Sequence, residues 1–378
     1  MQSVIIRKNQ AGQRLDKFLH KYLPNADTGF LYKMLRKKNI TLNGKKAAGS
    51  EKLEEGDCVD VFFSRETFEK FTGRTESVGK SASAGRPASA GRQNPAGKRD
   101  SFTSEYERAY RLLKGIQVLY EDDDFLFLNK PAGILTQKAK PEDCSLNEWM
   151  IGYLLQGNAG LAEELHTFRP SVCNRLDRNT SGIVLCGKSL AGLQFLSRHI
   201  RERSLRKFYH TICVGELREA ARIQGYLSKD GKTNKVSISG QRKKDDSRQD
   251  FLGERVFRGQ DYGRDRESAQ DYIETSYVPL NARGGYTYLE VELITGKPHQ
   301  IRAHLASMGH PLIGDFKYGE EKSNRRVKRE FGLQHQLLHA CRIVFPEIAP
   351  GVGAILSRRT FTAPEPELFL SIKASLEL

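Results

Sequence analysis

The sequence predicts an α+β protein in which a linker joins a small front domain to a larger second domain. Short apolar strands alternate with helices over residues 109–378, which favours a mixed, largely antiparallel sheet. Residues 1–64 indicate two amphipathic helices followed by small strands, and residues 65–108 have the composition of a linker. A chain of 378 residues is long enough for two such domains.

The front domain carries an excess of positive charge. Its apolar residues recur at helical spacing over 15–22 and 31–35, residues 40–45 indicate a strand ending in an Asn-Gly turn, and residues 59–63 a last strand. Residues 1–64 hold 12 Lys and Arg against 7 Asp and Glu. The basic residues that we expect to contact phosphate are Lys33, Arg36, Lys37, Lys38 and Lys45. The alternative is a solvated helix face, the usual role of such runs.

The linker prediction depends on residues 81–97, which are almost all Ser, Ala, Gly, Arg, Pro, Gln and Asn. Too few apolar groups are present to offset the entropy of ordering, so we expect residues 65–108 to be flexible. Such a linker would let the front domain search around the second one. Farther on, the charged and Gly-rich stretch near 229–271 indicates an insertion loop.

The second domain begins with two strands, at 118–120 and 125–128, before a Pro-Gly turn. Further strands are expected at 183–186, 209–214 and 288–293, and the apolar spacing of 192–200 predicts a helix.

The overall composition narrows the possible classes of protein. A net charge of +15 and a pI near 9.5 favour a polyanionic partner, with nucleic acid first. The six cysteines include no C-x-x-C pair, which argues against a zinc ribbon or a secreted disulfide scaffold. The sequence has no signal-peptide pattern at its start and no apolar run of about 20 residues, so a soluble cytoplasmic protein is expected.

The most informative stretch is Asn174-Arg175-Leu176-Asp177-Arg178-Asn179-Thr180-Ser181-Gly182, which precedes a buried strand. It places one carboxylate between two arginines, on a loop at the rim of a sheet. Taken alone, such a loop is more often a surface ion-pair cluster. Three later stretches change this interpretation: Lys207-Phe208-Tyr209, residues 293–305 with Lys297-Pro298-His299-Gln300-Ile301-Arg302, and Leu337-Leu338-His339-Ala340.

Together these stretches resemble the RluA-type RNA pseudouridine synthases, whose nucleophile loop usually has the form His-Arg-Leu-Asp-x-x-Thr-Ser-Gly. Asn174 stands where that pattern has His. The order of the matches and the 32 residues between Asp177 and Tyr209 agree with the family. The front domain similarly resembles the αL RNA-binding motif of a ribosomal small-subunit protein. The resemblance implies an α+β synthase domain and no cofactor.

The resemblance implies that Asp177, Tyr209 and Arg302 carry the chemistry. Asp177 would attack the anomeric carbon or take a proton from the neighbouring sugar carbon, and the sequence leaves both open. Arg175 and Arg178 are expected to keep Asp177 ionised. Tyr209 offers a ring for stacking and a hydroxyl to relay or accept the carbon-5 proton, and Arg302 is expected to pair with Asp177. Further substrate contacts are implied for Arg175, Arg178, Thr180, Lys207, His299 and Gln300.

The spacing of His299, His304 and His310 fits no metal motif, so no metal site is expected. Asp315 and His339 are expected to be structural. The predicted function is isomerisation of specific uridines in structured RNA by a monomer, with large-subunit ribosomal RNA preferred over transfer RNA. The alternatives are a non-catalytic RNA-binding or ribosome-assembly factor on the same scaffold, and, last, a hydrolase of the glycosidase type, which normally needs two carboxylates.

Overall fold

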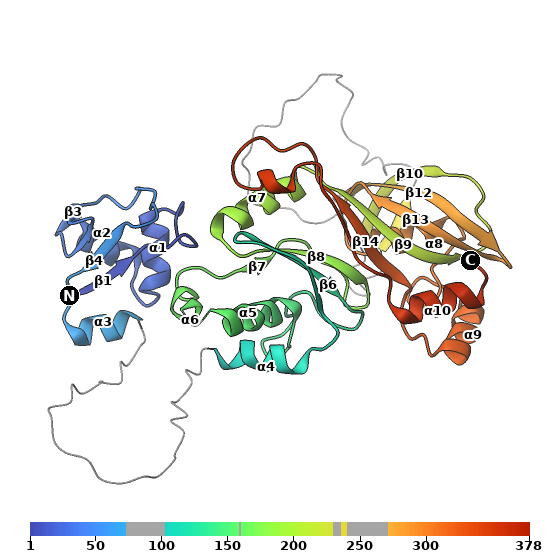
Figure 1. Cartoon of the computed structure of the whole chain (residues 1–378), viewed down its shortest axis with the longest axis horizontal. Helices are drawn as coiled ribbons and strands as arrows, with labels where there is room; N and C mark the ends of the chain where they lie inside the picture. The colour runs from blue at the N-terminus through green and yellow to red at the C-terminus, as the bar shows by residue number, and fades with distance from the viewer. Residues whose placement is uncertain (73–102, 159, 230–235, 240–270) are drawn as a thin grey trace, which may run out of the picture.

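The computed structural model describes residues 1–72, 103–158, 160–229, 236–239 and 271–378 and contains two sheets (Figure 1). A small four-stranded sheet belongs to the front domain, and an 11-stranded sheet forms the second domain. The α+β class is therefore confirmed. Within these ranges no helix has the length and apolar character needed to cross a membrane.

The front domain packs its helices on a sheet of order β1-β4-β2-β3. Its elements are β1 (Gln2–Ile5), α1 (Leu15–Tyr22), α2 (Thr28–Arg36), β2 (Ile40–Leu42), β3 (Lys45–Lys46), β4 (Cys58–Val61) and α3 (Arg65–Thr72). The predicted apolar stripes are buried in one core, in which Leu15 and Leu19 of α1 meet Val59 of β4. Asp27 begins α2 by accepting a hydrogen bond from the Phe30 amide at 2.7 Å. The strand β1 was not predicted.

The predicted linker 65–108 is too long at both ends. Residues 65–72 form α3, whose Phe68 is buried in the front core and whose Phe71 ring lies 4.3 Å from that of Phe30. At the other end, α4 (Ser104–Leu112) buries Tyr106 and Ala109 in the second domain. Both segments carry apolar residues at helical spacing. Charged residues between them made this pattern hard to recognise in the sequence. Residues 81–97, on which the prediction of flexibility rested, lie outside the described residues.

Polar contacts join the two domains, contrary to the prediction of a freely searching front domain. Arg7 Nη1 lies 2.8 Å from Glu164 Oε1, and Asn9 Nδ2 donates to the other carboxylate oxygen at 2.9 Å. Gln10 Nε2 donates to Thr167 Oγ1 at 2.6 Å, and both side chains are buried. Buried hydrogen bonds have defined geometry, so these contacts favour one orientation of the two domains.

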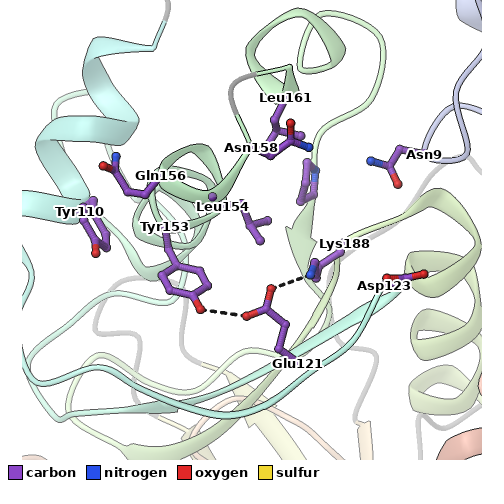
Figure 2. Close-up of a pocket in the computed structure, with 12 residues that line it drawn as sticks. Asn9, Tyr110, Glu121, Asp123, Tyr153, Leu154, Gln156, Asn158, Leu161 and Lys188 are labelled. Atoms are coloured by element: carbon purple, nitrogen blue, oxygen red, sulfur yellow. Dashed lines mark hydrogen bonds and ion pairs between the residues drawn. The ribbon is translucent and has the colours of Figure 1, made fainter.

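A pocket of about 420 Å³ lies at this domain junction. Figure 2 shows Asn9 reaching toward it from the front domain, opposite Tyr153 and Glu121. Tyr153 donates to Glu121 at 2.9 Å, and Lys188 Nζ lies 2.6 Å from the same carboxylate. None of the catalytic residues implied by the sequence lines this pocket.

The large sheet has the strand order β11-β10-β12-β13-β9-β14-β8-β6-β5, with β15 beside β14 and β7 beside β8. Its strands are β5 (Gln117–Glu121), β6 (Phe125–Lys130), β7 (Ser171–Val172), β8 (Ser181–Gly187), β9 (Arg206–Val214), β10 (Ala221–Lys229), β11 (Val236–Ser239), β12 (Asp271–Arg283), β13 (Tyr286–Leu293), β14 (Leu338–Val344) and β15 (Thr360–Thr362). Among these described strands, only β8 and β14 pair in parallel. The prediction of a mixed, largely antiparallel sheet is confirmed.

The insertion predicted near 229–271 is described only in part. The strand β10 runs to Lys229, β11 occupies 236–239 and β12 begins at Asp271, so these portions extend the sheet. The rest of the insertion lies outside the described residues.

Helices cover both faces of the large sheet (Figure 1). After α4 come α5 (Leu146–Gly157), α6 (Leu161–Glu164), α7 (Leu190–Arg201), α8 (Gln300–Ser307), α9 (Glu321–Phe331), the short η1 (Ala354–Leu356) and α10 (Glu367–Ser375). Because side chains alternate along a strand, the uninterrupted apolar runs of β6 and β8 fill two cores. Phe127 and Leu185 pack with α7, and Leu128 and Val184 with α4 and α5.

The parallel contact between β8 and β14 requires a glycine. Gly182 has φ +112°, and a Cβ there would lie 2.2 Å from the Ala340 carbonyl oxygen. Only glycine combines that conformation with so close an approach of two backbones. The Thr-Ser-Gly sequence therefore fixes where the loop bearing Asp177 enters the sheet.

Candidate active site

The loop that carries Asp177 connects β7 to β8 and is held by backbone and amide hydrogen bonds. The Thr180 amide donates to the Asp177 carbonyl oxygen at 3.0 Å. Asn174 donates to the Ile183 carbonyl oxygen at 3.3 Å and accepts from the Leu185 amide at 2.7 Å. The amide at position 174 thus ties the start of the loop to β8 in place of the usual His.

Arg302 on α8 joins Asp177 to a second, fully buried carboxylate. Arg302 Nη1 donates to Asp177 Oδ2 at 3.1 Å, as the sequence predicted. Its Nε and Nη2 donate to the two oxygens of Asp315 at 2.7 and 2.9 Å. Burial alone would lower the pKa of Arg302, but the bonds to Asp315 and Asp177 raise it overall. A two-pronged contact of this kind fixes the guanidinium plane, and with it the position of Asp177.

Tyr209 lies on β9 and lines the same pocket as Asp177. Its ring is largely buried, and its pKa is raised, first by burial and then by the negative charge of Asp177. The hydroxyl is therefore protonated at neutral pH. The neutral phenol can donate a hydrogen bond and present a ring face, but it is a weak base.

The pocket around Asp177 has a volume of about 680 Å³, and most of the charged residues that line it are positive. Asp177 is the one carboxylate among the described residues that line it. The cationic residues are Arg175, Arg178, Arg203, Lys207, Lys297 and Arg302. A single carboxylate among cations fits a reaction on a polyanion and does not fit hydrolysis by a carboxylate pair.

Arg175 and Arg178 line the pocket, and the effect expected of their charge on Asp177 stays a prediction. Both side chains are exposed, and Arg178 Nε donates to the Gly133 carbonyl oxygen at 3.1 Å. The guanidinium that contacts Asp177 comes from Arg302, which is 125 residues away in sequence. Neighbours along an extended loop point in different directions, so closeness in sequence to Asp177 does not by itself produce a side-chain contact with it.

Thr180 and Gln300 also line the pocket, yet their polar atoms are bonded within the protein. Thr180 is buried and accepts from Gln336 Nε2 at 3.3 Å. Gln300 donates to the Glu274 carbonyl oxygen and to Thr275, each at 2.9 Å. These hydrogen bonds are structural contacts within the protein. Substrate binding by Thr180 and Gln300 stays a prediction. Lys207 lines the pocket wall, and burial, with a smaller effect from Arg203, lowers its pKa.

Lys130 at the end of β6 supports the loop and was not predicted. Its ammonium donates to the carbonyl oxygens of Pro131, Ile134 and Arg178 at 3.0, 2.9 and 3.1 Å. Burial lowers its pKa to about 7, against a smaller opposing effect of Asp177. A Lys-Pro pair before a turn was visible in the sequence, but only the fold shows which carbonyls it reaches.

The histidines have separate partners. His304 Nδ1 lies 2.9 Å from Thr275 Oγ1, and His310 Nδ1 lies 2.9 Å from the Val214 carbonyl oxygen. His339 is buried between Ser181 at 2.9 Å and the Ala363 carbonyl oxygen at 3.2 Å, a structural position, as predicted.

Among the described residues, one cluster of side chains away from the Asp177 pocket could hold a metal ion. It consists of His210, Glu290 and Cys341. Glu290 is ion-paired with Arg342 at 2.7 Å, and His210 Nδ1 lies 2.6 Å from Glu365. Burial raises the pKa of the Cys341 thiol to about 12, which disfavours the thiolate that a metal would need.

Comparisons with known proteins agree with this geometry. Residues 124–307 match the family described as RNA pseudouridylate synthase. The chain is 26% identical to the ribosomal large subunit pseudouridine synthase C of Vibrio cholerae, over 91% of this chain and 89% of that one. It is 27% identical to the Escherichia coli K12 protein of the same name, over 93% and 90%. The solved structure of human RNA pseudouridylate synthase domain containing 4 has the same fold, with a TM-score of 0.51, 20% identity, and coverage of 72% of this chain and 97% of that chain.

The sequence similarity, together with the fold, places this chain in the class of enzymes that isomerise uridine in RNA. The chain belongs, within that class, to the RluA family of RNA pseudouridine synthases. RNA is accordingly its partner, and the alternative of a non-catalytic factor is not supported.

Proposed function

We propose that this enzyme converts uridines of large-subunit ribosomal RNA to pseudouridine, acting as a monomer in the cytoplasm. The observation that carries the proposal is the charge of the pocket. Among the described residues that line it, Asp177 is the one carboxylate, and the other charged side chains are cationic. The curated relatives in Vibrio and Escherichia are named for the large ribosomal subunit, which favours that RNA over transfer RNA.

Asp177 is the group that acts on the sugar. Its contact with Arg302 and its short distance to His299 both involve Oδ2, so Oδ1 is the oxygen proposed to face the ribose. Arg302 holds the carboxylate in place. Either attack on the anomeric carbon or removal of the adjacent sugar proton would release the base, and both use this oxygen.

The walls of the pocket bind the target nucleotide. A uridine in folded RNA must leave its stack before the sugar can be reached. Tyr209 would then stack on the uracil ring, and Arg175 would fill the space left in the RNA. Arg178 and Lys207 would contact the flanking phosphates, since cationic side chains usually supply most of the affinity for RNA.

The front domain, residues 1–72, is proposed as an RNA-binding module. The basic residues predicted to contact phosphate are all exposed: Lys33, Arg36, Lys37, Lys38 and Lys45. The first four lie at the end of α2 or just after it, and Lys45 begins β3. The contacts of Gln10 and Arg7 with the second domain would hold this basic surface at a set distance from Asp177.

Replacing Lys33, Arg36, Lys37 and Lys38 by Gln is expected to weaken RNA binding and flatten its dependence on salt. If each contacts one phosphate, the slope of log K against log salt falls by about 3. Titration of one RNA at several salt concentrations measures the slope. The matched control replaces four exposed basic residues of α9 by Gln: Lys322, Arg325, Lys328 and Arg329. Equal slopes in both variants would mean that net charge, and not α2, governs binding.

The proposed substrate is tested by mapping pseudouridine at single-nucleotide resolution. Ribosomal and transfer RNA are compared between cells with and without the gene, and after complementation with wild type or with Asp177→Asn. We expect specific large-subunit positions to disappear without the gene and to return only with wild type. Loss confined to transfer RNA would overturn the proposed target, and unchanged maps would overturn the proposed function.

A further inference from the structure

The pocket at the domain junction is built by both domains and lies apart from the catalytic pocket. Asn9 reaches it from the front domain, and most of its wall comes from α4, α5 and the ends of β5 and β8 (Figure 2). Its volume of about 420 Å³ is typical of ligand sites, which occur preferentially at domain interfaces. Lys188 follows β8 whereas the Asp177 loop precedes it, so the length of that strand, roughly 20 Å, separates the two pockets.

Two tyrosine rings form one side of the junction pocket. Tyr110 of α4 and Tyr153 of α5 both line it, with ring centroids 6.4 Å apart (Figure 2). Behind them, the buried Trp149 lies parallel to Tyr153, with centroids 5.5 Å apart and an angle of 6° between the planes. The stack fixes the Tyr153 ring, and a fixed ring face beside a cavity suits a ligand that is itself flat.

Three side-chain amides give the pocket hydrogen-bonding groups of both kinds. Asn9 Nδ2 donates to Glu164 at 2.9 Å, and Gln156 Nε2 donates to the Gly152 carbonyl oxygen at 3.4 Å. Asn158 Oδ1 accepts from the Gly160 amide at 3.0 Å. These bonds set the orientation of each amide. Within the described ranges, the opposite ends have no partner, which leaves two acceptors, Asn9 Oδ1 and Gln156 Oε1, and one donor, Asn158 Nδ2.

The two carboxylates that line the pocket are each paired with a lysine. Glu121 accepts from Tyr153 at 2.9 Å and lies 2.6 Å from Lys188 Nζ, and Asp123 lies 2.9 Å from Lys8 Nζ. Lys8 and its neighbour Arg7 are exposed, so positive charge is present beside the pocket. Exposed pairs are weak, and Lys8 can exchange Asp123 for a phosphate at little cost.

We propose that this pocket binds one unstacked base of the RNA substrate, at a nucleotide away from the target uridine. A nucleobase has flat faces that stack on tyrosine and an edge that carries both donors and acceptors. Its phosphates stay outside, beside Arg7 and Lys8. RNA is the partner of this enzyme, so the proposal depends on RNA binding and not on which uridine is converted. A base held by walls from both domains also stabilises their docked arrangement.

The first test is photochemical crosslinking of the full-length protein to short single-stranded RNAs. One RNA carries 5-iodouridine and a second carries 8-azidoadenosine, so that both pyrimidine and purine bases are offered. Mass spectrometry then identifies the linked residues. We expect links to Tyr110 or Tyr153 with at least one probe. Links to Tyr209 report on the catalytic pocket independently, so failure of the proposed stacking at Tyr209 is distinguishable from failure at the junction. Absence of links to both junction tyrosines would overturn the proposal.

The second test uses Trp149, the single tryptophan of the chain, as a reporter of the junction pocket. Base-bearing RNA is expected to quench its fluorescence with saturation, whereas an abasic RNA of the same length and charge should not. Asn158→Asp keeps the oxygen that accepts from Gly160 and removes the free donor, so the fold is retained. It should weaken the affinity measured by quenching about fivefold.

The matched control is Asn281→Asp, which makes the same change at an exposed position of β12 and should leave that affinity within twofold. Equal quenching by abasic RNA would show that the junction responds to phosphate or to a distant binding event, and it would overturn base binding. Equal affinities in the two variants would also contradict the proposal, because recognition by the pocket amides requires that only Asn158→Asp weakens binding.

Discussion

Asp177→Asn is expected to stop the conversion of uridine to pseudouridine, with a loss of at least about 1,000-fold. Asn matches the size of Asp and can still accept the Arg302 hydrogen bond at the Oδ2 position. It cannot attack the anomeric carbon or take a sugar proton, and in the described pocket no second carboxylate lies ready to replace it. RNA affinity should stay within about twofold, because phosphate contacts supply most of the binding. Single-turnover conversion and equilibrium binding of the same RNA measure the two quantities.

The matched control for Asp177→Asn is Glu347→Gln, which also removes one negative charge. Glu347 is exposed and paired with Arg358 on the surface, so this variant should keep both conversion and affinity. Conversion by Asp177→Asn near the wild-type rate would remove Asp177 from the chemistry. Weak RNA binding by that variant would instead indicate a disturbed pocket.

The local parts of the site could be predicted because the sequence itself encodes them. The apolar run after Gly182 predicted a buried strand, and the Thr-Ser-Gly turn placed Asp177 at its edge. The pairing of Arg302 with Asp177 followed from the family resemblance and is confirmed as a contact. These features depend on short motifs, which keep their meaning without knowledge of distant contacts.

Contacts between distant segments could not be predicted. The three carbonyl oxygens bound by Lys130 converge only when β6, its following turn and the Asp177 loop are in place. The same applies to Gln10 and Thr167, which are 157 residues apart and meet at the domain junction. A polar residue gives no sign in sequence of which partner will bury it.

Asp315→Ala is expected to lower the free energy of unfolding by about 3 kcal/mol, because removing one partner leaves a buried charge uncompensated. Asp315 is fully buried and binds Arg302 through both oxygens. Without it, Arg302 would no longer hold Asp177, so conversion should also fall steeply. Urea unfolding and single-turnover conversion measure the two effects. The matched control is Glu321→Gln, which breaks the exposed pair with Arg325 and should change stability by less than about 0.5 kcal/mol.

The effect of Asp315 should also depend on pH. Burial alone would raise its pKa, but the hydrogen bonds and charge of Arg302 lower it overall. A carboxyl whose pKa is lowered in the folded state stabilises the protein above its unfolded pKa of about 3.9, and it loses that effect as pH falls through the lowered value. Wild type and Asp315→Asn should therefore differ most near neutral pH and converge in acid. A stability difference between the two proteins that is constant with pH, or absent at pH 7, would show that the pair with Arg302 does not stabilise the site. The position of Asp177 would then have to depend on the loop contacts made by Lys130 and Asn174.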